Sequence, residues 1–202
     1  MAVGSGAYAV SDDIELVEGG AAHLLDENAL VVADMHLGCE AALEYEGLSL
    51  PRVQSRKIEG YVLDVIDRIG PSRVVVAGDL KHNFSRNLAQ EWRDVSRFVE
   101  LLAGRAPLEV VKGNHDNYLS IILKERGLPL KREARVGRFR ILHGHEGRSL
   151  RGPTVMGHIH PSIRLKDRLG AGVKDPCFLW SERKEVLVLP ALSIVASGAD
   201  VV

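Results

Sequence analysis

Residues 73–79 read Arg-Val-Val-Val-Ala-Gly-Asp, a β-branched run that ends in a glycine and a carboxylate. An uninterrupted run of this kind is typical of a strand that is buried on both faces. Before it, Pro51 to Ile69 carries apolar side chains every three or four positions, and Gly70-Pro71 would end that helix. After it, Leu88 to Ala103 repeats the helical pattern. This part of the chain therefore predicts a helix, a buried strand and a second helix in succession.

The rest of the chain extends this alternation. Ile14 to Val17 and Ala22 to Leu25, parted by Glu18-Gly19-Gly20, have the pattern of a hairpin. The other expected elements are the strands Ala29–Ala33, Leu108–Val111, Arg138–Leu142, Thr154–Met156 and Glu185–Leu189, and a short helix from Tyr118 to Arg126. Strands and helices alternate in the first half, and strands dominate the second. This order predicts an α/β fold built on a pair of mixed sheets with helices outside.

The composition fits one globular domain. The chain has 202 residues, of which 46% are hydrophobic and 26% charged, and we interpret residues 1–202 as a single domain. The 26 basic and 27 acidic residues nearly balance, so nothing global attracts the protein to a polyanion. Its apolar runs are far shorter than a membrane span. We therefore expect no membrane association.

The N-terminus and the cysteines predict the cellular compartment of the protein. Residues 1–10 have no basic segment leading into an apolar one, so they do not read as a secretion signal. Two cysteines, Cys39 and Cys177, cannot build a disulfide framework. The expected compartment is the reducing cytoplasm.

Polar clusters follow five of the predicted strands, and seven of the eight histidines lie in or beside them. In open α/β sheets, ligands bind beyond the carboxyl ends of the strands, which is where these clusters fall. In chain order the clusters are Asp34-Met35-His36, Gly78-Asp79, Gly113-Asn114-His115-Asp116, His143-Gly144-His145 and Gly157-His158-Ile159-His160.

The residue types in these clusters suit metal-assisted phosphoryl chemistry. Asp34 and His36 lie two apart, so in an extended segment their side chains point the same way and could share an ion. The Asp79 carboxylate could bridge two cations, and ions roughly 3.5–4 Å apart can clamp the attacking and leaving oxygens of a phosphate. His115 suits a general acid because an unperturbed histidine side chain exchanges its proton near neutral pH, and we expect Asp116 to orient its imidazole.

The ligand types also limit the metal. Carboxylate, amide and imidazole without thiolate do not fit a closed structural zinc site. They favour octahedral Mn²⁺, with Fe, Zn²⁺ or Ni²⁺ as alternatives. We interpret Cys39, three residues after His36, as a packing residue.

Each cluster alone has an ordinary explanation. An Asp-X-His pair arises by chance, a Gly-Asp after a strand is commonly a turn, and Asn114-His115-Asp116 could start a helix. His-X-His pairs also occur at protein surfaces. Five such clusters after five strands of one short chain make independent coincidence a poor explanation.

The combined order of the clusters, from Asp34 to His160, is similar to the signature of the calcineurin-like metallophosphoesterases. This resemblance implies a four-layer αββα sandwich of two mixed β-sheets flanked by helices. It also implies a metal-bridging hydroxide as nucleophile and His115 as the acid or transition-state stabiliser. One metal would be held by Asp34, His36, Asp79 and His160, and the other by Asp79, Asn114, His143 and His158.

Three shorter sequence motifs resemble those of one group within this family. Residues 33–38, 78–82 and 189–191 look like those of the small SbcD-related phosphoesterases of archaea and the bacterial DNA ligase-associated phosphoesterases. That group implies Mn²⁺-dependent phosphodiesterase chemistry, with DNA or RNA ends and cyclic phosphates as candidate substrates. The main alternatives are a phosphomonoesterase or cyclic-nucleotide phosphodiesterase with the same ligands. A non-catalytic scaffold is a further alternative.

A few residues near the clusters have less certain roles. His145 could replace His143 as a ligand, although His143 lies nearer the strand end and matches the family position. Lys81 and His82 follow Asp79 and could contact substrate phosphate, or could equally be a solvated loop pair. Arg148 and Arg151 lie between two clusters and could bind phosphate in a bidentate way. The oligomeric state is not predicted.

Overall fold

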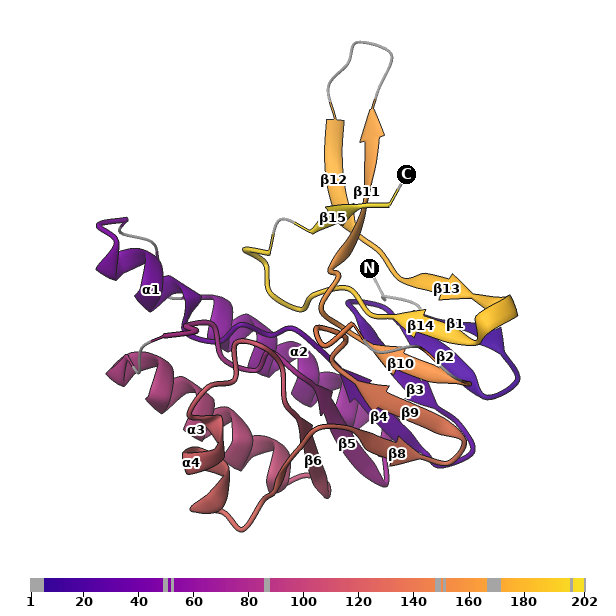
Figure 1. Ribbon diagram of the computed structural model, residues 1–202, viewed down its shortest axis with the longest axis horizontal. Helices are drawn as coiled ribbons and strands as arrows, with labels where there is room; N and C mark the ends of the chain where they lie inside the picture. The colour runs from indigo at the N-terminus through magenta and orange to yellow at the C-terminus, as the bar shows by residue number, and fades with distance from the viewer. Residues whose placement is uncertain are drawn as a thin grey trace.

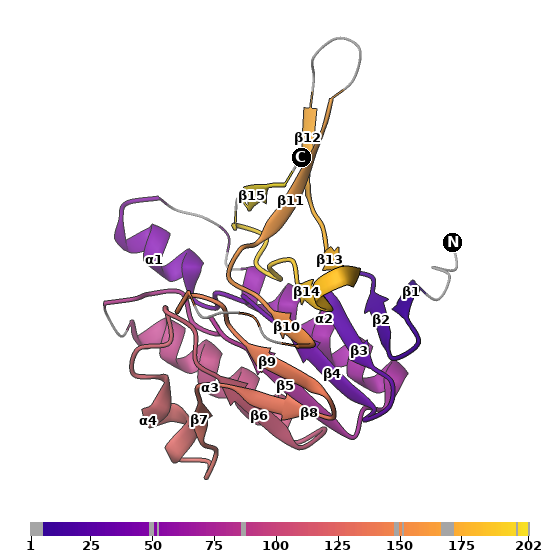
Figure 2. The same ribbon diagram turned by 45° about the vertical axis from the view of Figure 1, so that its right-hand side comes forward.

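The structure is a computed structural model that describes residues 6–48, 51, 53–85, 88–147, 150, 152–166, 172–196 and 198–201. Two β-sheets lie face to face, and α-helices cover one outer face (Figure 1). A narrow hairpin projects from one end of this body, as both ribbon views show (Figure 2).

The first sheet has seven strands in the order β1-β2-β3-β4-β5-β6-β7. The strands β1 to β4 are antiparallel, whereas β4, β5, β6 and β7 are parallel. The carboxyl ends of β4, β5 and β6 therefore lie at one edge. The bounds are β1 (Ala7–Ser11), β2 (Ile14–Val17), β3 (Ala21–Leu24), β4 (Ala29–Val32), β5 (Arg73–Ala77), β6 (Leu108–Val111) and β7 (Leu130–Lys131).

The second sheet has five strands in the order β13-β14-β10-β9-β8. Its three central strands, β9, β10 and β14, are parallel, so their carboxyl ends also share an edge. The bounds are β8 (Ala134–Val136), β9 (Phe139–Leu142), β10 (Thr154–Met156), β13 (Leu179–Ser181) and β14 (Val186–Val188), followed by a small third sheet of β11 (Pro161–Lys166), β12 (Gly172–Pro176) and β15 (Ala199–Asp200).

Two hydrophobic cores explain why the central strands are apolar throughout. On β4, Leu30 and Val32 pack against the helices, whereas Ala29 and Val31 pack against the second sheet. Alternate side chains of a strand point to opposite faces, so a strand between two cores needs apolar residues at every position. The helices are α1 (Cys39–Tyr45), α2 (Gln54–Ile69), α3 (Ala89–Ala103), α4 (Leu119–Lys124) and the 3-10 helix η1 (Glu182–Lys184).

The predicted fold class is confirmed: the chain is mixed α/β, with two large mixed sheets. The helices are distributed unequally, however. The α2, α3 and α4 helices pack on the first sheet, and the described residues after α4 add only η1. The expected helical layer outside the second sheet is thus reduced to one 3-10 turn. None of the described helices is long and apolar enough to cross a membrane.

Helices and strands with a clear apolar periodicity were predicted well, and those without one were missed. The strand Arg73–Ala77 has the expected bounds, and α2 begins at Gln54, three residues after the expected Pro51. The prediction missed α1 and the hairpin of β11 and β12. The two hairpin strands are largely exposed, so burial imposes little apolar periodicity on them, and α1 is only seven residues long.

Candidate metal centre

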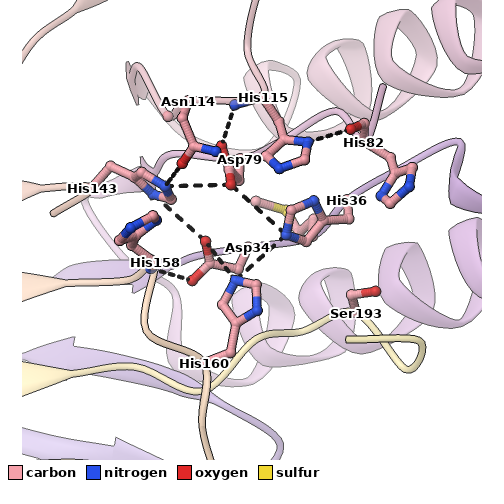
Figure 3. A network of polar contacts seen from close by, with 12 residues as sticks. Asp34, His36, Asp79, His82, Asn114, His115, His143, His158, His160 and Ser193 are labelled. Atoms are coloured by element: carbon pink, nitrogen blue, oxygen red, sulfur yellow. Dashed lines mark hydrogen bonds and ion pairs between the residues drawn. The ribbon is translucent and has the colours of Figure 1, made fainter. Parts of the chain in front are cut away.

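Loops at the carboxyl ends of five strands place the candidate ligands together (Figure 3). Asp34 and His36 follow β4, Asp79 follows β5, and Asn114 follows β6. His143 directly follows β9, and His158 and His160 follow β10. The first sheet thus contributes Asp34, His36, Asp79 and Asn114, whereas the second sheet contributes His143, His158 and His160.

A first group of possible ligands comprises Asp34, His36 and His160, whose ligand atoms lie within 4.8 Å of one another. The His160 Nε2 atom is 3.3 Å from Asp34 Oδ1 and 3.5 Å from His36 Nε2. Two imidazole nitrogens that approach so closely around a carboxylate oxygen have a geometry that suits a shared cation.

A second group comprises Asp79, His143 and His158, within the same 4.8 Å limit. The His143 Nε2 atom is 3.3 Å from Asp79 Oδ2 and 3.0 Å from Asn114 Oδ1. The amide oxygen of Asn114 therefore adds a fourth candidate ligand to this group. His145 belongs to neither group, although its ring lies 5.2 Å from that of His143.

The Asp79 carboxylate lies between the two groups. Its Oδ2 atom is 3.3 Å from His143 Nε2 on one side and 3.8 Å from His36 Nε2 on the other. Its Oδ1 atom accepts a hydrogen bond of 2.8 Å from the backbone N–H of His115. One carboxylate is thus placed to contact ions in both positions.

The buried polar atoms fit a cation in this centre. Asp34 Oδ1 is buried and has no hydrogen-bond donor among the described residues. A buried carboxylate oxygen is costly unless a hydrogen bond or an ion compensates its lost hydration. Carboxylate, amide and imidazole donors also form a ligand set for a divalent metal. The residues present therefore fit the predicted metal ions.

The ligand loops have a strained backbone. Eight described non-glycine residues have positive φ angles, and five of them are candidate ligands. Side chains of L-residues crowd the backbone in this region, which costs of order 1–3 kcal/mol at each residue. The five are Asp34, His36, Asp79, His158 and His160. Such strain clusters at functional sites because the surrounding fold imposes it.

Two glycines allow the ligands to approach one another. A Cβ atom on Gly78, which has a φ of +87°, would lie 2.5 Å from His143 Nδ1. A Cβ atom on Gly113 would lie 2.1 Å from Asp79 Oδ1 and 2.3 Å from the Asp79 backbone nitrogen. The loops can therefore meet only if these positions carry no side chain.

Asp116 joins two of the ligand loops. Its Oδ2 atom accepts hydrogen bonds from the backbone N–H groups of Asp79 (2.9 Å) and Gly113 (2.7 Å). Its Oδ1 atom accepts from those of Leu80 (3.0 Å) and Lys81 (3.2 Å). The expectation that Asp116 orients the His115 imidazole is therefore wrong. Its carboxylate is committed to backbone groups and holds the loops in place.

The His115 imidazole is oriented by a backbone carbonyl instead. Its Nδ1 atom contacts the carbonyl oxygen of His82. Because a carbonyl only accepts hydrogen bonds, Nδ1 carries a proton, which leaves Nε2 to exchange a proton with substrate. His115 also forms a possible metal-binding group with His36 and Asp79.

Burial and neighbouring charges shift the pKa values of the ligands. Burial lowers the pKa of His36 to about 3, which keeps this imidazole neutral, as metal binding requires. Burial alone would raise the pKa of Asp79, but the hydrogen bond and charge of His143 outweigh it and lower the pKa to about 2. Burial raises the pKa of Asp116 to about 6, against the hydrogen bonds from backbone N–H groups.

The residues predicted to contact substrate phosphate have different positions. Lys81 is 2% exposed, its Nζ atom is 3.5 Å from Glu91 Oε2, and it donates to the carbonyls of Asn83 and His115. This lysine is therefore a buried structural cation, which contradicts both alternatives, a phosphate contact and a solvated loop residue. His82 lines a pocket beside the centre. Arg148 and Arg151 lie outside the described residues.

The sequence analysis missed the residues that support the first group. Gln54 is fully buried, and its side-chain amide donates to the carbonyls of Met35 (3.4 Å) and His36 (3.1 Å). Its Oε1 atom accepts from the Ser193 hydroxyl at 3.2 Å. A glutamine at the start of a helix carries no motif, so the sequence offered no signal for this role.

Comparison with known families agrees with this arrangement. A family described as calcineurin-like phosphoesterase matches residues 28–184, a span that contains all seven candidate ligands. The chain belongs to the calcineurin-like phosphoesterase family. This member of the family is therefore a phosphoesterase and a hydrolase, and the family depends on metal ions.

Two solved structures are similar to this chain. The crystal structure of Pseudomonas putida nuclease MPE matches with a TM-score of 0.70 and 18% identity, over 94% of this chain and 86% of that chain. Yfce, a phosphoesterase from E. coli, matches with a TM-score of 0.47 and 17% identity, over 85% of this chain and 83% of that chain. At this identity the first likeness establishes the fold alone. No curated protein sequence matches the chain significantly.

We predict that Gly113→Ala disrupts the centre. The new methyl group would meet both the side chain and the backbone of Asp79, so the loop must shift. We expect a loss of roughly 1–3 kcal/mol in the free energy of unfolding, as for other overpacked sites, together with weaker Mn²⁺ binding. Denaturant unfolding and metal titration measure the two effects.

Gly60→Ala in α2 is the matched control, because a Cβ atom there meets nothing within 4 Å. It should leave metal binding unchanged and stabilise the helix by up to about 1 kcal/mol. A Gly113→Ala protein with the stability and metal affinity of the wild type would contradict the packing argument.

Proposed function

We propose that the chain is a binuclear phosphodiesterase that acts on nucleic-acid ends or nucleotides, with Mn²⁺ as the preferred metal. The observation that carries this proposal is the position of Asp79. Its carboxylate lies between the group of His36 and the group of His143, at 3.8 Å and 3.3 Å from their Nε2 atoms. A single carboxylate between two ligand groups is what two adjacent cations require.

The proposed roles of the ligands follow the two groups. Asp34, His36, Asp79 and His160 would hold one ion, and Asp79, Asn114, His143 and His158 the other. Because the two sheets contribute ligands to the same centre, we also propose that residues 1–202 act as one domain. The two cations, when bound, would lower the pKa of water and neutralise phosphate charge.

The proposed reaction needs a proton donor, and His115 is placed for it. Hydrolysis forms a bond between a water oxygen and phosphorus and breaks the bond to the leaving oxygen, which then requires a proton. The His115 backbone is tied to Asp79 Oδ1, and its Nδ1 is tied to the His82 carbonyl. These two contacts fix the ring beside the metal ligands and leave Nε2 to donate the proton.

The substrate class remains part of the proposal. The short phrases at residues 33–38, 78–82 and 189–191 support a relation to SbcD-related and DNA ligase-associated phosphoesterases. The solved structure that shares the fold is described as a nuclease. Both observations favour nucleic-acid ends or nucleotides as substrates over unrelated phosphoesters.

We expect the purified, Mn²⁺-loaded protein to hydrolyse bis-p-nitrophenyl phosphate and to lose this activity when a chelator removes the metal. Release of p-nitrophenolate measures the rate, and the monoester p-nitrophenyl phosphate serves as the comparison substrate. If neither ester shows metal-dependent turnover, the proposed function is wrong. Faster turnover of the monoester would instead favour a phosphomonoesterase.

We expect Asp79→Asn to weaken metal binding at both positions, because it removes the shared charge but keeps the side-chain shape. The affinity for Mn²⁺ should fall by at least roughly 10–100-fold. That is the loss caused by substituting residues that only hydrogen-bond to a metal ligand. Calorimetric titration with Mn²⁺ and elemental analysis measure this change. Asp67→Asn on the exposed surface of α2 is the control. Loss of one ion with full retention of the other would exclude a bridging role.

We expect the His115→Ala protein to keep both ions. Its kcat should fall by about 10²–10⁴-fold, because a general acid typically accelerates a reaction by that factor. The loss should be large for a diester with a poor leaving group and small for p-nitrophenolate, which needs no protonation. Metal analysis of the variant is the second measurement. A variant that lost metal would make His115 a ligand, and one with full activity on the poor leaving group would remove it from the acid role.

A further inference from the structure

A pocket of about 510 Å³ opens beside the candidate metal centre. His36 and His160 of the first ligand group form part of its lining, and so does His115. Pockets of roughly 300–1,000 Å³ are the usual size of small-molecule sites. The pocket is therefore large enough to hold a substrate group next to a phosphate at the centre.

The walls of this pocket are apolar. Leu43 comes from α1, Ile159 lies between two candidate ligands, and Val195 and Ala196 come from the segment before β15. Val195 and Ile159 are 45% and 40% exposed, so apolar surface faces the opening. The His82 and His115 rings, 5.9 Å apart and inclined by 29°, add two aromatic faces.

Charge is distributed unequally around the centre. Among the described residues that line the pocket there is no lysine, arginine, aspartate or glutamate. On the opposite side, the small recess at His143 and His145 is lined by charged side chains of both signs, namely Lys112, Arg132, Glu133 and Glu146. Away from the candidate ligands His36 and His160, a phosphate in this pocket would lose hydration without gaining a lysine or arginine as a partner, at a high cost.

The wall of the pocket is tied to the metal ligands. The backbone N–H of Ser193 donates to the Asp34 carbonyl at 3.1 Å, and that of Ala199 donates to the His160 carbonyl at 2.8 Å. Ser193 also donates its hydroxyl hydrogen to Gln54, whose amide contacts the His36 carbonyl. The segment that carries Val195 is thus anchored at both ends to ligand residues, and Figure 3 shows Ser193 close to this side of the centre.

We propose that this pocket binds the nucleobase of the nucleotide whose phosphate lies at the metal centre. The proposal rests on the proposed function and adds a direction to it: the base enters on the side of His36 and His160. A base is uncharged and has an aromatic face, which suits apolar walls and imidazole rings. Any further phosphates of the nucleic acid would lie outside this pocket.

Two diesters with the same leaving group test the pocket. Thymidine 5′-(p-nitrophenyl phosphate) carries a base, whereas methyl p-nitrophenyl phosphate does not. We expect kcat/KM for the thymidine ester to be at least roughly tenfold higher than for the methyl ester. This factor corresponds to the lower end of the binding energy that stacking of one base contributes. Equal values for the two esters would overturn the proposal.

Two neighbouring substitutions locate the effect. Val195→Asp places a charge in the pocket, whereas Ile194→Asp places the same charge one residue away, on a side chain that is 60% exposed and outside the lining. Val195→Asp should remove most of the preference for the thymidine ester, measured as the ratio of its kcat/KM to that of the methyl ester. Ile194→Asp should change neither ester. Equal effects of both variants on both esters would overturn the assignment.

Binding of adenosine to the Mn²⁺-loaded protein separates the pocket from the catalytic proposal, because adenosine has no phosphate to hydrolyse. We expect calorimetric binding that Val195→Asp weakens and Ile194→Asp does not. If neither ester is hydrolysed but adenosine binds in this way, the proposed function fails and the pocket stands. If the esters are hydrolysed but adenosine does not bind, or binds equally to both variants, the pocket proposal fails alone.

Discussion

Four backbone N–H groups from two loops converge on the buried carboxylate of Asp116, and the geometry of the candidate metal centre depends on this interaction. Three of them belong to residues 79–81 and the fourth to Gly113. Asp116 therefore sets the distance between the loops of β5 and β6, and with it the position of Asp79 relative to Asn114. Buried N–H groups without such a partner would be costly, so the carboxylate and the loops stabilise one another.

The centre combines several features that oppose folding. Five ligands have left-handed backbone angles, and Asp34, Asp79 and His143 are buried ionisable groups. Two hydrophobic cores, one beneath the helices and one between the sheets, offset these costs on either side of the first sheet. Two glutamates also support the site through hydrogen bonds. Glu40 accepts them from the backbone N–H groups of Val53 and Gln54, and Glu91 accepts them from those of His82 and Asn83. The support of the site is thus spread over α1, α2 and α3.

The candidate ligands could be predicted because their types and places in the chain both carry information. Each follows a strand whose apolar run is visible in the sequence, and carboxyl ends of parallel strands meet at one edge. The supporting residues could not be found in this way. Gln54, Glu91 and Asp116 act on backbone groups, and nothing in a side chain's identity shows which distant N–H or carbonyl it will contact. For the same reason the burial of Lys81 beside Glu91 was not predicted, since a phosphate contact and a solvated loop were the two alternatives.

By itself, the sequence determined the α/β class with two mixed sheets and the five clusters that can bind metal, because these follow from apolar periodicity and local residue types. The order of the clusters also carried the resemblance to the family. Only the tertiary structure decided that Asp79 lies between two ligand groups, that Asp116 holds loops instead of the His115 ring, and that one side of the centre is apolar. These features join residues that are far apart in the chain. The distances between them are set by how the strands and helices pack, which no local pattern records.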